Sequence, residues 1–204
     1  ELDVVFENVN AALIERAAPK PGERVLDVGC GTGATTRAFA AHLVPDGCVT
    51  ALDISEPLLS HAELQASKAH VITRYHLVDA QQDQIPGAPF DLATSRFGVM
   101  FFSDPVAAFV NIREHLRPGG RLVVAAWAPM KGNPWFEVPK DAAVARLGPA
   151  DASSPNAPGP LGFQDIDHVV EILEKAGFQD VVGGTSQIVL AHPGPLDRVA
   201  NLVS

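Results

Sequence analysis

The sequence is short of positive charge and has no long apolar run. Its 204 residues include 15 lysines and arginines against 24 aspartates and glutamates, for a formal net charge of −9. Nucleic acids and anionic membrane surfaces attract basic patches, so this balance argues against both as partners. No apolar run approaches the length that crosses a membrane, and no signal peptide is visible at the start, which is Glu1 rather than Met.

Cysteine is also scarce, because Cys30 and Cys48 are the two that the chain contains. Two cysteines form neither a disulfide framework nor a metal-binding cluster. Reduced, buried cysteines in a cytoplasmic protein are the interpretation that this usage favours, and we expect no metal. An apolar content of 47% with 19% charged residues is ordinary for a globular protein, and the length predicts one domain.

The most informative stretch is residues 25–33, which read Val-Leu-Asp-Val-Gly-Cys-Gly-Thr-Gly. The apolar start predicts a short buried parallel strand. The alternate glycines predict a tight turn, because glycine accepts a positive φ and lets a ligand lie against the backbone. Residues 34–43 predict a helix directly afterwards. Strand, turn and helix together predict a nucleotide-type site with free backbone N–H groups facing the ligand.

Two ligand classes fit this geometry, and one of them is a dinucleotide. Such a site has the pattern Gly-x-Gly-x-x-Gly or Gly-x-Gly-x-x-Ala, with an acid about 20 residues further on. Gly29, Gly31 and Ala34 match the pattern, and Asp53 supplies the acid. An NAD-dependent oxidoreductase is therefore one hypothesis, and a glycine turn that merely joins strand to helix is another.

Asp27 separates the two ligand classes. It stands two residues before the first glycine, where a carboxylate would repel a pyrophosphate and would suit a cationic ligand. With Gly33, the order acid-x-Gly-x-Gly-x-Gly resembles the first motif of the class I S-adenosylmethionine-dependent methyltransferases. That cofactor carries an ammonium and a sulfonium and no phosphate, so the resemblance implies S-adenosylmethionine as cofactor and S-adenosylhomocysteine as product.

The segments that follow alternate between apolar strands and helices. Strand predictions cover Arg24–Val28, Cys48–Asp53, Val71–Val78, Phe90–Ser95 and Arg121–Trp127, with helices over 34–43, 55–68 and Val106–Leu116 between them. This alternation predicts a parallel, doubly wound sheet. The resemblance is close over residues 13–127, includes the turn at Leu116–Leu122, and is looser over 163–182. It implies a Rossmann-like, mostly parallel sheet with helices on both faces, a three-layer α/β fold.

Two further acids end predicted strands at the same edge of the sheet. Asp53 can accept hydrogen bonds from both hydroxyls of a ribose. The resemblance implies that Asp79 faces the adenine amino group and that the backbone N–H of Ala80 meets a ring nitrogen. Ordinary strand-end or helix-capping acids are the alternative for both. The full set of expected cofactor residues is Asp27, Gly29, Cys30, Gly31, Thr32, Gly33, Asp53, Ile54, Asp79, Ala80, Gln81 and Arg96.

An apolar loop, Arg96–Phe102, follows the fourth predicted strand and is placed to line an acceptor pocket, with core packing as the alternative. It resembles, with the segment Trp127–Trp135, the small-molecule group similar to quinone-biosynthesis C-methyltransferases. No Asn-Pro-Pro-aromatic motif follows that strand, which disfavours DNA methylation. None of the seven histidines lies in a motif that orients it, so no general base is identified. The expected pocket residues are Phe97, Phe101, Trp127 and Trp135.

The flanking segments are less regular, within one expected domain. Residues 4–18 predict a helix that packs on the sheet or covers the cofactor, and Lys140–Leu147 predicts a helix inside a Pro- and Gly-rich insert. Asp165 or Asp167 caps a helix that reaches Ala176. The apolar runs Phe178–Val182 and Ser186–Ala191 predict strands, the second of them either a seventh strand or a continuation of the sixth, and Pro195–Ser204 predicts the start of another helix. The expected parts are 1–20 (N-terminal helix), 21–127 (cofactor-binding core), 128–164 (lid or insert) and 165–204 (C-terminal helix and strands).

These features lead to a functional hypothesis. We expect transfer of a methyl group from S-adenosylmethionine to a small-molecule acceptor, by in-line displacement and without a metal. Nucleic acid and membrane are not expected as partners, and a homodimer stays open. The alternatives are the NAD-dependent oxidoreductase and a protein that binds S-adenosylmethionine without turning it over.

Asp53 gives a direct test of the cofactor assignment. Replacing it by alanine, Asp53→Ala, removes the ribose acceptor and should weaken S-adenosylhomocysteine binding by about tenfold or more. Calorimetric titration of the variant and the unmodified protein measures this, with NAD titrated in parallel as the competing ligand. Unchanged affinity for S-adenosylhomocysteine would refute the assignment of Asp53.

Overall fold

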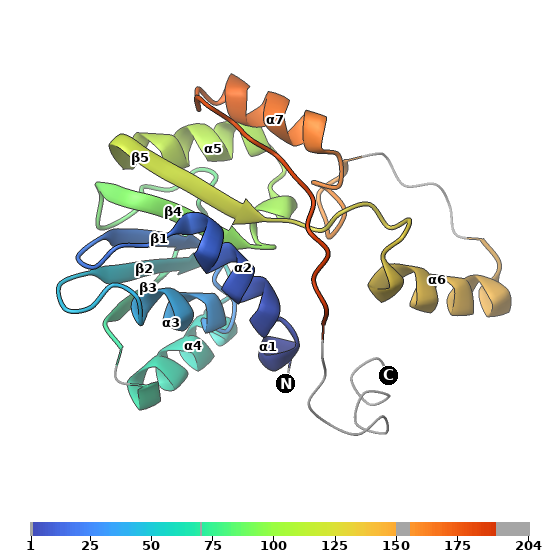
Figure 1. Cartoon of the computed structure of the whole chain (residues 1–204), viewed down its shortest axis with the longest axis horizontal. Helices are drawn as coiled ribbons and strands as arrows, with labels where there is room; N and C mark the ends of the chain where they lie inside the picture. Colours follow the sequence, from blue (N-terminus) through green and yellow to red (C-terminus); the bar gives the residue numbers. More distant parts are fainter. Residues whose placement is uncertain (1, 70, 150–155, 191–204) are drawn as a thin grey trace.

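Five parallel strands form one sheet in the order β3-β2-β1-β4-β5 (Figure 1). The computed structural model describes residues 2–69, 71–149 and 156–190. The five strands are β1 Arg24–Val28, β2 Cys48–Asp53, β3 Thr73–Leu77, β4 Phe90–Arg96 and β5 Leu116–Ala125. The strand order reverses between β1 and β4. In an open parallel sheet, the crevice beyond the carboxyl ends of strands at such a reversal is where ligands bind.

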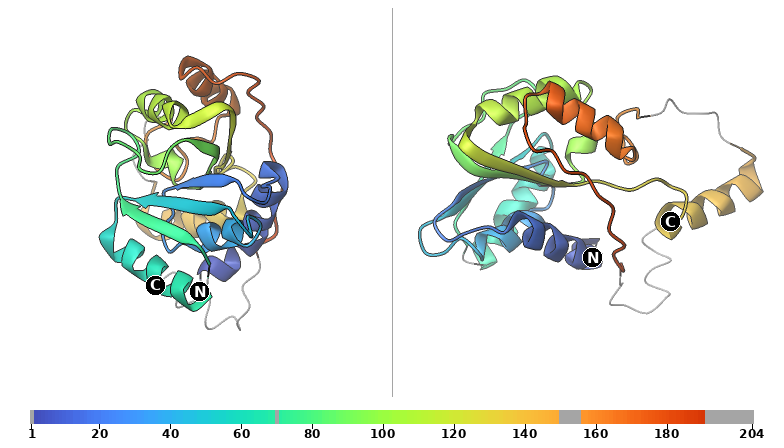
Figure 2. Two further views of the ribbon diagram at one scale, coloured as in Figure 1. Left: turned by 90° about the vertical axis from the view of Figure 1, so that its left-hand side faces the viewer. Right: turned by 45° about the horizontal axis from the view of Figure 1, so that its top comes forward.

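Helices cover both faces of the sheet, which makes three layers (Figure 2). On one face, Leu13 and Phe39 pack against Val25. On the other, Phe109 packs in the cluster that contains Leu26. The predicted doubly wound α/β fold is thus confirmed. The helices are α1 Leu2–Val5, α2 Glu7–Ala17, α3 Ala34–Ala40, α4 Glu56–Ala69, α5 Pro105–Glu114, α6 Pro134–Leu147 and α7 Ile166–Lys175, with a short 3₁₀ helix η1 at Val99–Phe101.

The predicted N-terminal helix over residues 4–18 is two helices, α1 and α2, separated at Phe6. The ring of Phe6 contacts Phe97, Trp127 and Trp135. Helical periodicity alone would not separate this residue from its neighbours. The aromatic contacts, which come from distant parts of the chain, account for where the helix is interrupted.

The strand predicted from Arg121 begins earlier, at Leu116, because the intervening residues pair irregularly with β4. Phe90 pairs with Leu116 and Leu92 pairs with Arg121, so five residues of β5 correspond to two of β4. Gly119 lies in this irregular part with a φ of +76°. The turn predicted here is therefore a bulged beginning of the strand, which glycine allows by adopting positive φ.

Three further helices differ from prediction in length. The helix expected over Val106–Leu116 ends at Glu114, and Leu116 instead begins β5. The helix expected over 34–43 ends at Ala40, and the helix expected from Lys140 begins at Pro134, directly after Asn133. Proline is favoured in the first turn of a helix, where its missing N–H has no partner to lose. None of the residues of α6 is buried, and the helix extends away from the sheet (Figure 1). Among the described helices, none is both long and apolar enough to cross a membrane.

The C-terminal part corrects two strand predictions. Helix α7 forms as expected and begins after Asp165, whose carboxylate accepts hydrogen bonds from two backbone N–H groups. Residues 178–182 and 186–190 are not strands; within the described ranges they have no regular structure, and Ala191 and 195–204 lie outside those ranges. Apolar composition forms a strand only where a ladder partner is available. This segment instead passes toward α2, where the Asn8 side-chain amide donates to the Val189 carbonyl at 2.8 Å.

Arg121 fastens the end of α2 to the sheet. Its guanidinium donates to both carboxylate oxygens of Glu23, at 2.8 and 2.9 Å. It also donates to the carbonyl of Ala17, the last residue of α2, at 2.9 Å and to that of Ala18, directly after the helix, at 3.2 Å. This pairing holds the pKa of the Glu23 carboxyl below its usual value. One side chain of β5 therefore satisfies an acid beside β1 and two otherwise free helix carbonyls.

Replacing Arg121 should therefore cost stability. Arg121→Met leaves the nearly buried Glu23 carboxylate and two carbonyls without their donor, and should lower the free energy of unfolding by about 2 kcal/mol, allowing for the partial exposure of Arg121. Urea denaturation measures the change. Lys175→Met is the matched control, because its i,i+4 pair with Glu171 is exposed and should contribute far less. Equal losses in both variants would contradict this role of Arg121.

Candidate functional site

The glycine turn after β1 adopts the predicted positive φ angles, +66°, +54° and +74° at Gly29, Gly31 and Gly33. A Cβ added at Gly29 would lie 2.8 Å from the Cα of Gly98, so these two backbones touch. At Gly33 an added Cβ would meet Ala62 at 2.9 Å. At Gly31 an added Cβ would have nothing within 4 Å. The turn is thus packed at both ends and open in the middle, where a ligand can lie against the backbone.

An open cavity of about 240 Å³ lies against this turn. Five expected cofactor residues line it, four of them from the turn and the fifth at the end of β4. Asp3 of α1 and Phe6, the residue between α1 and α2, also line this cavity, whereas Leu13 of α2 packs on the sheet. Covering of the cofactor by the N-terminal segment stays a prediction. The lining residues are Asp3, Phe6, Gly29, Cys30, Gly31, Thr32, Thr35, Leu58 and Arg96.

Asp53 lies directly beside the turn. One carboxylate oxygen accepts a hydrogen bond from the Gly31 N–H at 2.7 Å, and the other accepts from the Ser55 N–H at 2.9 Å. Each oxygen retains a lone pair for a ribose hydroxyl. Ile54 is largely exposed next to it. Asp53 therefore supports the turn that lines the cavity without lining the cavity itself, and its contact with a ribose stays a prediction.

Asp79, Ala80 and Gln81 form a loop after β3 that is anchored on α5. The Asp79 carboxylate accepts from the Gln81 N–H at 2.9 Å, and the Ala80 carbonyl accepts from the Asn111 amide at 2.9 Å. The Gln81 side chain accepts from the Asp104 N–H at 2.9 Å, so it points to the start of α5. These three residues lie outside the cavity lining, and their adenine contacts stay predictions.

Asp27 is fully buried behind the turn rather than on the cavity wall. One of its oxygens accepts from the Thr36 hydroxyl at 2.6 Å, and the other has no hydrogen-bond partner among the described residues. Burial raises the pKa of the Asp27 carboxyl to about 6, against the hydrogen bond from Thr36 and the charge of Arg96, which lower it. Its charge therefore acts on a ligand through the turn, and direct contact with the cofactor ammonium stays a prediction.

Three of the four expected acceptor residues meet in an aromatic cluster, defined by Phe6, Phe97, Trp127, Trp135 and Phe136. Phe97 stacks on Trp127 with ring centroids 4.6 Å apart, and Trp127 stacks on Trp135 at 6.1 Å. Phe6 meets all three edge-on at 5.5–5.9 Å, and Phe136 meets Trp127 at 5.0 Å. Phe6 also lines the cavity, so the aromatic cluster adjoins the glycine turn.

Phe101 is not part of the aromatic cluster. Its side chain is 58% exposed on η1, and none of the described aromatic contacts involves it. Its neighbour Phe102 instead packs against Phe109 in the core. Sequence reasoning also missed Phe6, Phe136, Asp3, Leu58 and Thr35. Phe136 and Thr35 stand close in sequence to expected site residues, but only the fold brings the other three to the site.

Comparison with known proteins agrees with this geometry. Residues 25–120 match the family described as "Methyltransferase domain". The ubiquinone/menaquinone biosynthesis C-methyltransferase of Ralstonia pickettii is 30% identical over 192 residues, which are 89% of this chain and 78% of that protein. This chain belongs to the class I S-adenosylmethionine-dependent methyltransferases. A second relative of the same description, from Burkholderia vietnamiensis, is 36% identical over 125 residues, 59% of this chain and 51% of the relative.

Solved structures of methyltransferases share the fold. A putative methyltransferase from Bacillus halodurans aligns with a TM-score of 0.60 and 27% identity, covering 83% of this chain and 68% of that one. An S-adenosylmethionine-dependent methyltransferase from Aquifex aeolicus aligns with a TM-score of 0.65 at 18% identity, covering 92% and 86%. The match spans about half the length of the Burkholderia vietnamiensis relative and of several other relatives with the same description.

The residues of this methyltransferase fit its cofactor, S-adenosylmethionine. The open face at Gly31 accommodates a ligand against the backbone, Asp53 retains acceptors for hydroxyls, and Asp27 places negative charge behind the turn. The cofactor carries an ammonium and a sulfonium, which this charge favours. Neither the NAD-dependent oxidoreductase nor the non-catalytic binding protein finds support in these relatives.

Asp27 predicts a pH dependence of stability. Its folded pKa of about 6 lies above the usual 3.8, so the folded state holds a proton that the unfolded state loses first. Stability should fall as the pH rises from 4 through 6, by about 3 kcal/mol at most. Asp27→Asn keeps an acceptor for Thr36 and removes the titration, so its advantage over the unmodified protein should grow across this window.

Urea denaturation at pH 4, 5, 6 and 7 measures this difference. Asp46→Asn, at an exposed turn, is the matched control and should run parallel to the unmodified protein. A constant difference between Asp27→Asn and the unmodified protein at all four pH values would contradict the raised pKa of Asp27.

Proposed function

We propose that this methyltransferase acts on a small acceptor that carries a flat aromatic ring, and that the aromatic cluster holds this ring beside the cofactor. The observation that supports this most directly is the position of Phe6, which lines the cavity at the glycine turn and also meets three rings of the cluster. Relatives described as ubiquinone/menaquinone biosynthesis C-methyltransferases support a quinol-like ring as the acceptor.

In this proposal the protein mainly positions and dries the reactants. The cofactor supplies a methyl group that its sulfonium already activates. The stacked rings of Phe97, Trp127 and Trp135 hold a planar acceptor in one orientation and exclude water. Positioning of two reactants for in-line displacement can supply several kcal/mol of the barrier. At a carbon of an electron-rich ring, the C–CH₃ bond forms as the S–CH₃ bond of the cofactor breaks, and the ring proton is then lost to water, so no strong base is needed beside it.

We also propose that the insert, residues 128–164, acts as a lid on the acceptor side. Trp135 lies at the start of α6 and stacks on Trp127, which follows β5, so the aromatic cluster connects this helix to the sheet. The single-domain division and the assigned cofactor residues belong to the same proposal. The proposal also includes an acceptor that is not a nucleic acid, which the net charge of −9 supports. It includes a cytoplasmic location, which the two free cysteines support. A homodimer stays open.

The proposal is tested first by an acceptor screen. Methyl transfer from radiolabelled S-adenosylmethionine is measured with quinols and phenols, and with aliphatic amines and carboxylates of similar size. Turnover of the aromatic acceptors alone supports the proposal. Turnover of the aliphatic acceptors alone would overturn it.

A variant of the aromatic cluster then tests the role of the stack. Trp127→Leu removes the ring between Phe97 and Trp135 and should raise the KM for the aromatic acceptor about tenfold. Stacking of an aromatic side chain on the acceptor ring contributes on the order of 1 kcal/mol or more to binding. The Kd for S-adenosylhomocysteine, measured by calorimetry, should change less than twofold. Phe101→Leu is the matched control outside the cluster. Equal effects of both substitutions on KM would count against the stack as the acceptor site.

A further inference from the structure

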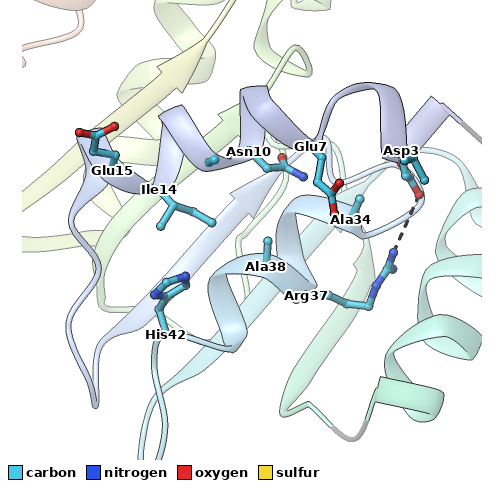
Figure 3. Close-up of a pocket in the computed structure, with 11 residues that line it drawn as sticks. Asp3, Glu7, Asn10, Ile14, Glu15, Ala34, Arg37, Ala38 and His42 are labelled. Carbon is cyan, nitrogen blue, oxygen red and sulfur yellow. Dashed lines mark ion pairs between the residues drawn. The ribbon is translucent and has the colours of Figure 1, made fainter. Parts of the chain in front are cut away.

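Three donor groups converge on the carboxylate of Asp3 in α1. The Thr32 hydroxyl, from the glycine turn, donates to its two oxygens at 2.8 and 2.9 Å. Arg96, at the end of β4, lies 3.6 Å from one oxygen, and Arg37, on α3, lies 3.9 Å from the other. Figure 3 shows Arg37 pointing from α3 toward Asp3. We call Thr32, Arg37 and Arg96 the carboxylate cradle.

The cradle requires an anion. Burial lowers the pKa of the Arg96 guanidinium, and the positive charge of Arg37 acts in the same direction, whereas Asp3 and Asp27 oppose them. Two partly buried cations near each other are unfavourable unless a negative group lies between them. Asp3 is that group in this structure.

The exposed partner of the cradle is the acid. The side chain of Asp3 is 34% exposed, against 21% for Arg37 and 12% for Arg96. Further hydrogen bonds hold the two arginines in place: Arg37 donates to the Thr32 carbonyl at 2.8 Å, and Arg96 donates to the Asn10 side chain at 3.2 Å. Asp3 lies on a helix of four residues near the start of the chain. The cations are therefore fixed, and the carboxylate is the part that can be exchanged.

The cradle borders the cofactor cavity, because Asp3, Thr32 and Arg96 line it together with the glycine turn. S-adenosylmethionine ends in an α-amino acid, so it brings one carboxylate to this turn. We propose that the cradle of Thr32, Arg37 and Arg96 is the subsite for the α-carboxylate of the cofactor, and that Asp3 is an internal substitute which this carboxylate displaces. This inference rests on the cofactor and not on the identity of the acceptor.

Displacement of Asp3 has a consequence for the acceptor side. Phe6 follows α1 directly and meets three rings of the aromatic cluster, while the Arg96 guanidinium lies 5.5 Å from the centre of its ring. When the cofactor carboxylate takes the cradle, α1 is released at Asp3, and Phe6 is free to leave the cluster. Binding of the cofactor thereby makes the aromatic cluster accessible to the acceptor.

The experiment compares two ligands that differ by the carboxylate alone. S-adenosylhomocysteine carries it, and decarboxylated S-adenosylhomocysteine keeps the ammonium and lacks it. Calorimetry gives both Kd values for each variant, and their ratio is the readout. Because both ligands meet the same folded protein, a general loss of stability or of the adenosine site cancels in the ratio.

Asp3→Asn removes the substitute and should tighten S-adenosylhomocysteine binding about fivefold to tenfold, with no gain for the decarboxylated ligand. Arg37→Gln should weaken S-adenosylhomocysteine about tenfold and leave the decarboxylated ligand within twofold. Glu7→Gln is the control. Glu7 lines a second pocket, between α2 and α3, together with Asp3 and Arg37 (Figure 3), and no described ion pair involves it. In Glu7→Gln the ratio of the two Kd values should stay unchanged.

Equal changes for both ligands in Asp3→Asn would overturn the proposal, since a purely structural clasp of α1 acts on both alike. An unchanged ratio in Arg37→Gln would overturn it as well. Neither outcome depends on an acceptor, so the acceptor proposal stands or falls separately.

Discussion

The site depends on one close approach of two backbones. Gly29 in the turn after β1 touches Gly98 in the loop after β4, where a Cβ on either residue would lie 2.8 Å or less from the other loop's backbone. Ser95 reinforces the contact, because its hydroxyl donates to the Val28 carbonyl at 2.7 Å and accepts from the Gly98 N–H at 3.1 Å. The cofactor turn and the loop that carries Phe97 are thereby held at a fixed separation, which an in-line transfer requires.

Groups of both charges lie near this junction. Asp27 is fully buried and does not line the cavity, whereas Arg96 and Asp3 line it and Arg37 reaches Asp3 from α3. An amino acid zwitterion bound at the turn would meet negative potential at its ammonium and positive potential at its carboxylate. Since both sets of groups are shielded from water, their fields are stronger at the ligand than those of surface charges. Such an arrangement favours one orientation of the bound zwitterion and also strengthens its binding.

The sequence analysis succeeded where a pattern is local. Strands β1 and β2 have their predicted bounds, since an apolar run, an acid and glycines follow one another within a few residues. It failed at 178–182 and 186–190, because apolar composition does not show whether a neighbouring strand is available. It also missed Asp3, which meets Thr32 across 29 residues of sequence, and Phe6, which reads as an ordinary apolar residue of a helix. Contacts of this kind exist only after the sheet has assembled.

Phe97 combines a strained backbone with a stacked side chain. Its φ of +68° is one that glycine adopts freely and a bulky aromatic residue adopts at a cost of order 1 kcal/mol or more. Its ring nevertheless stacks within 5° of parallel on Trp127. A glycine would be the least strained residue at this corner. The stacking of this ring on Trp127 offsets at least part of the backbone strain, so the corner holds a flat aromatic surface where an unstrained glycine would leave none.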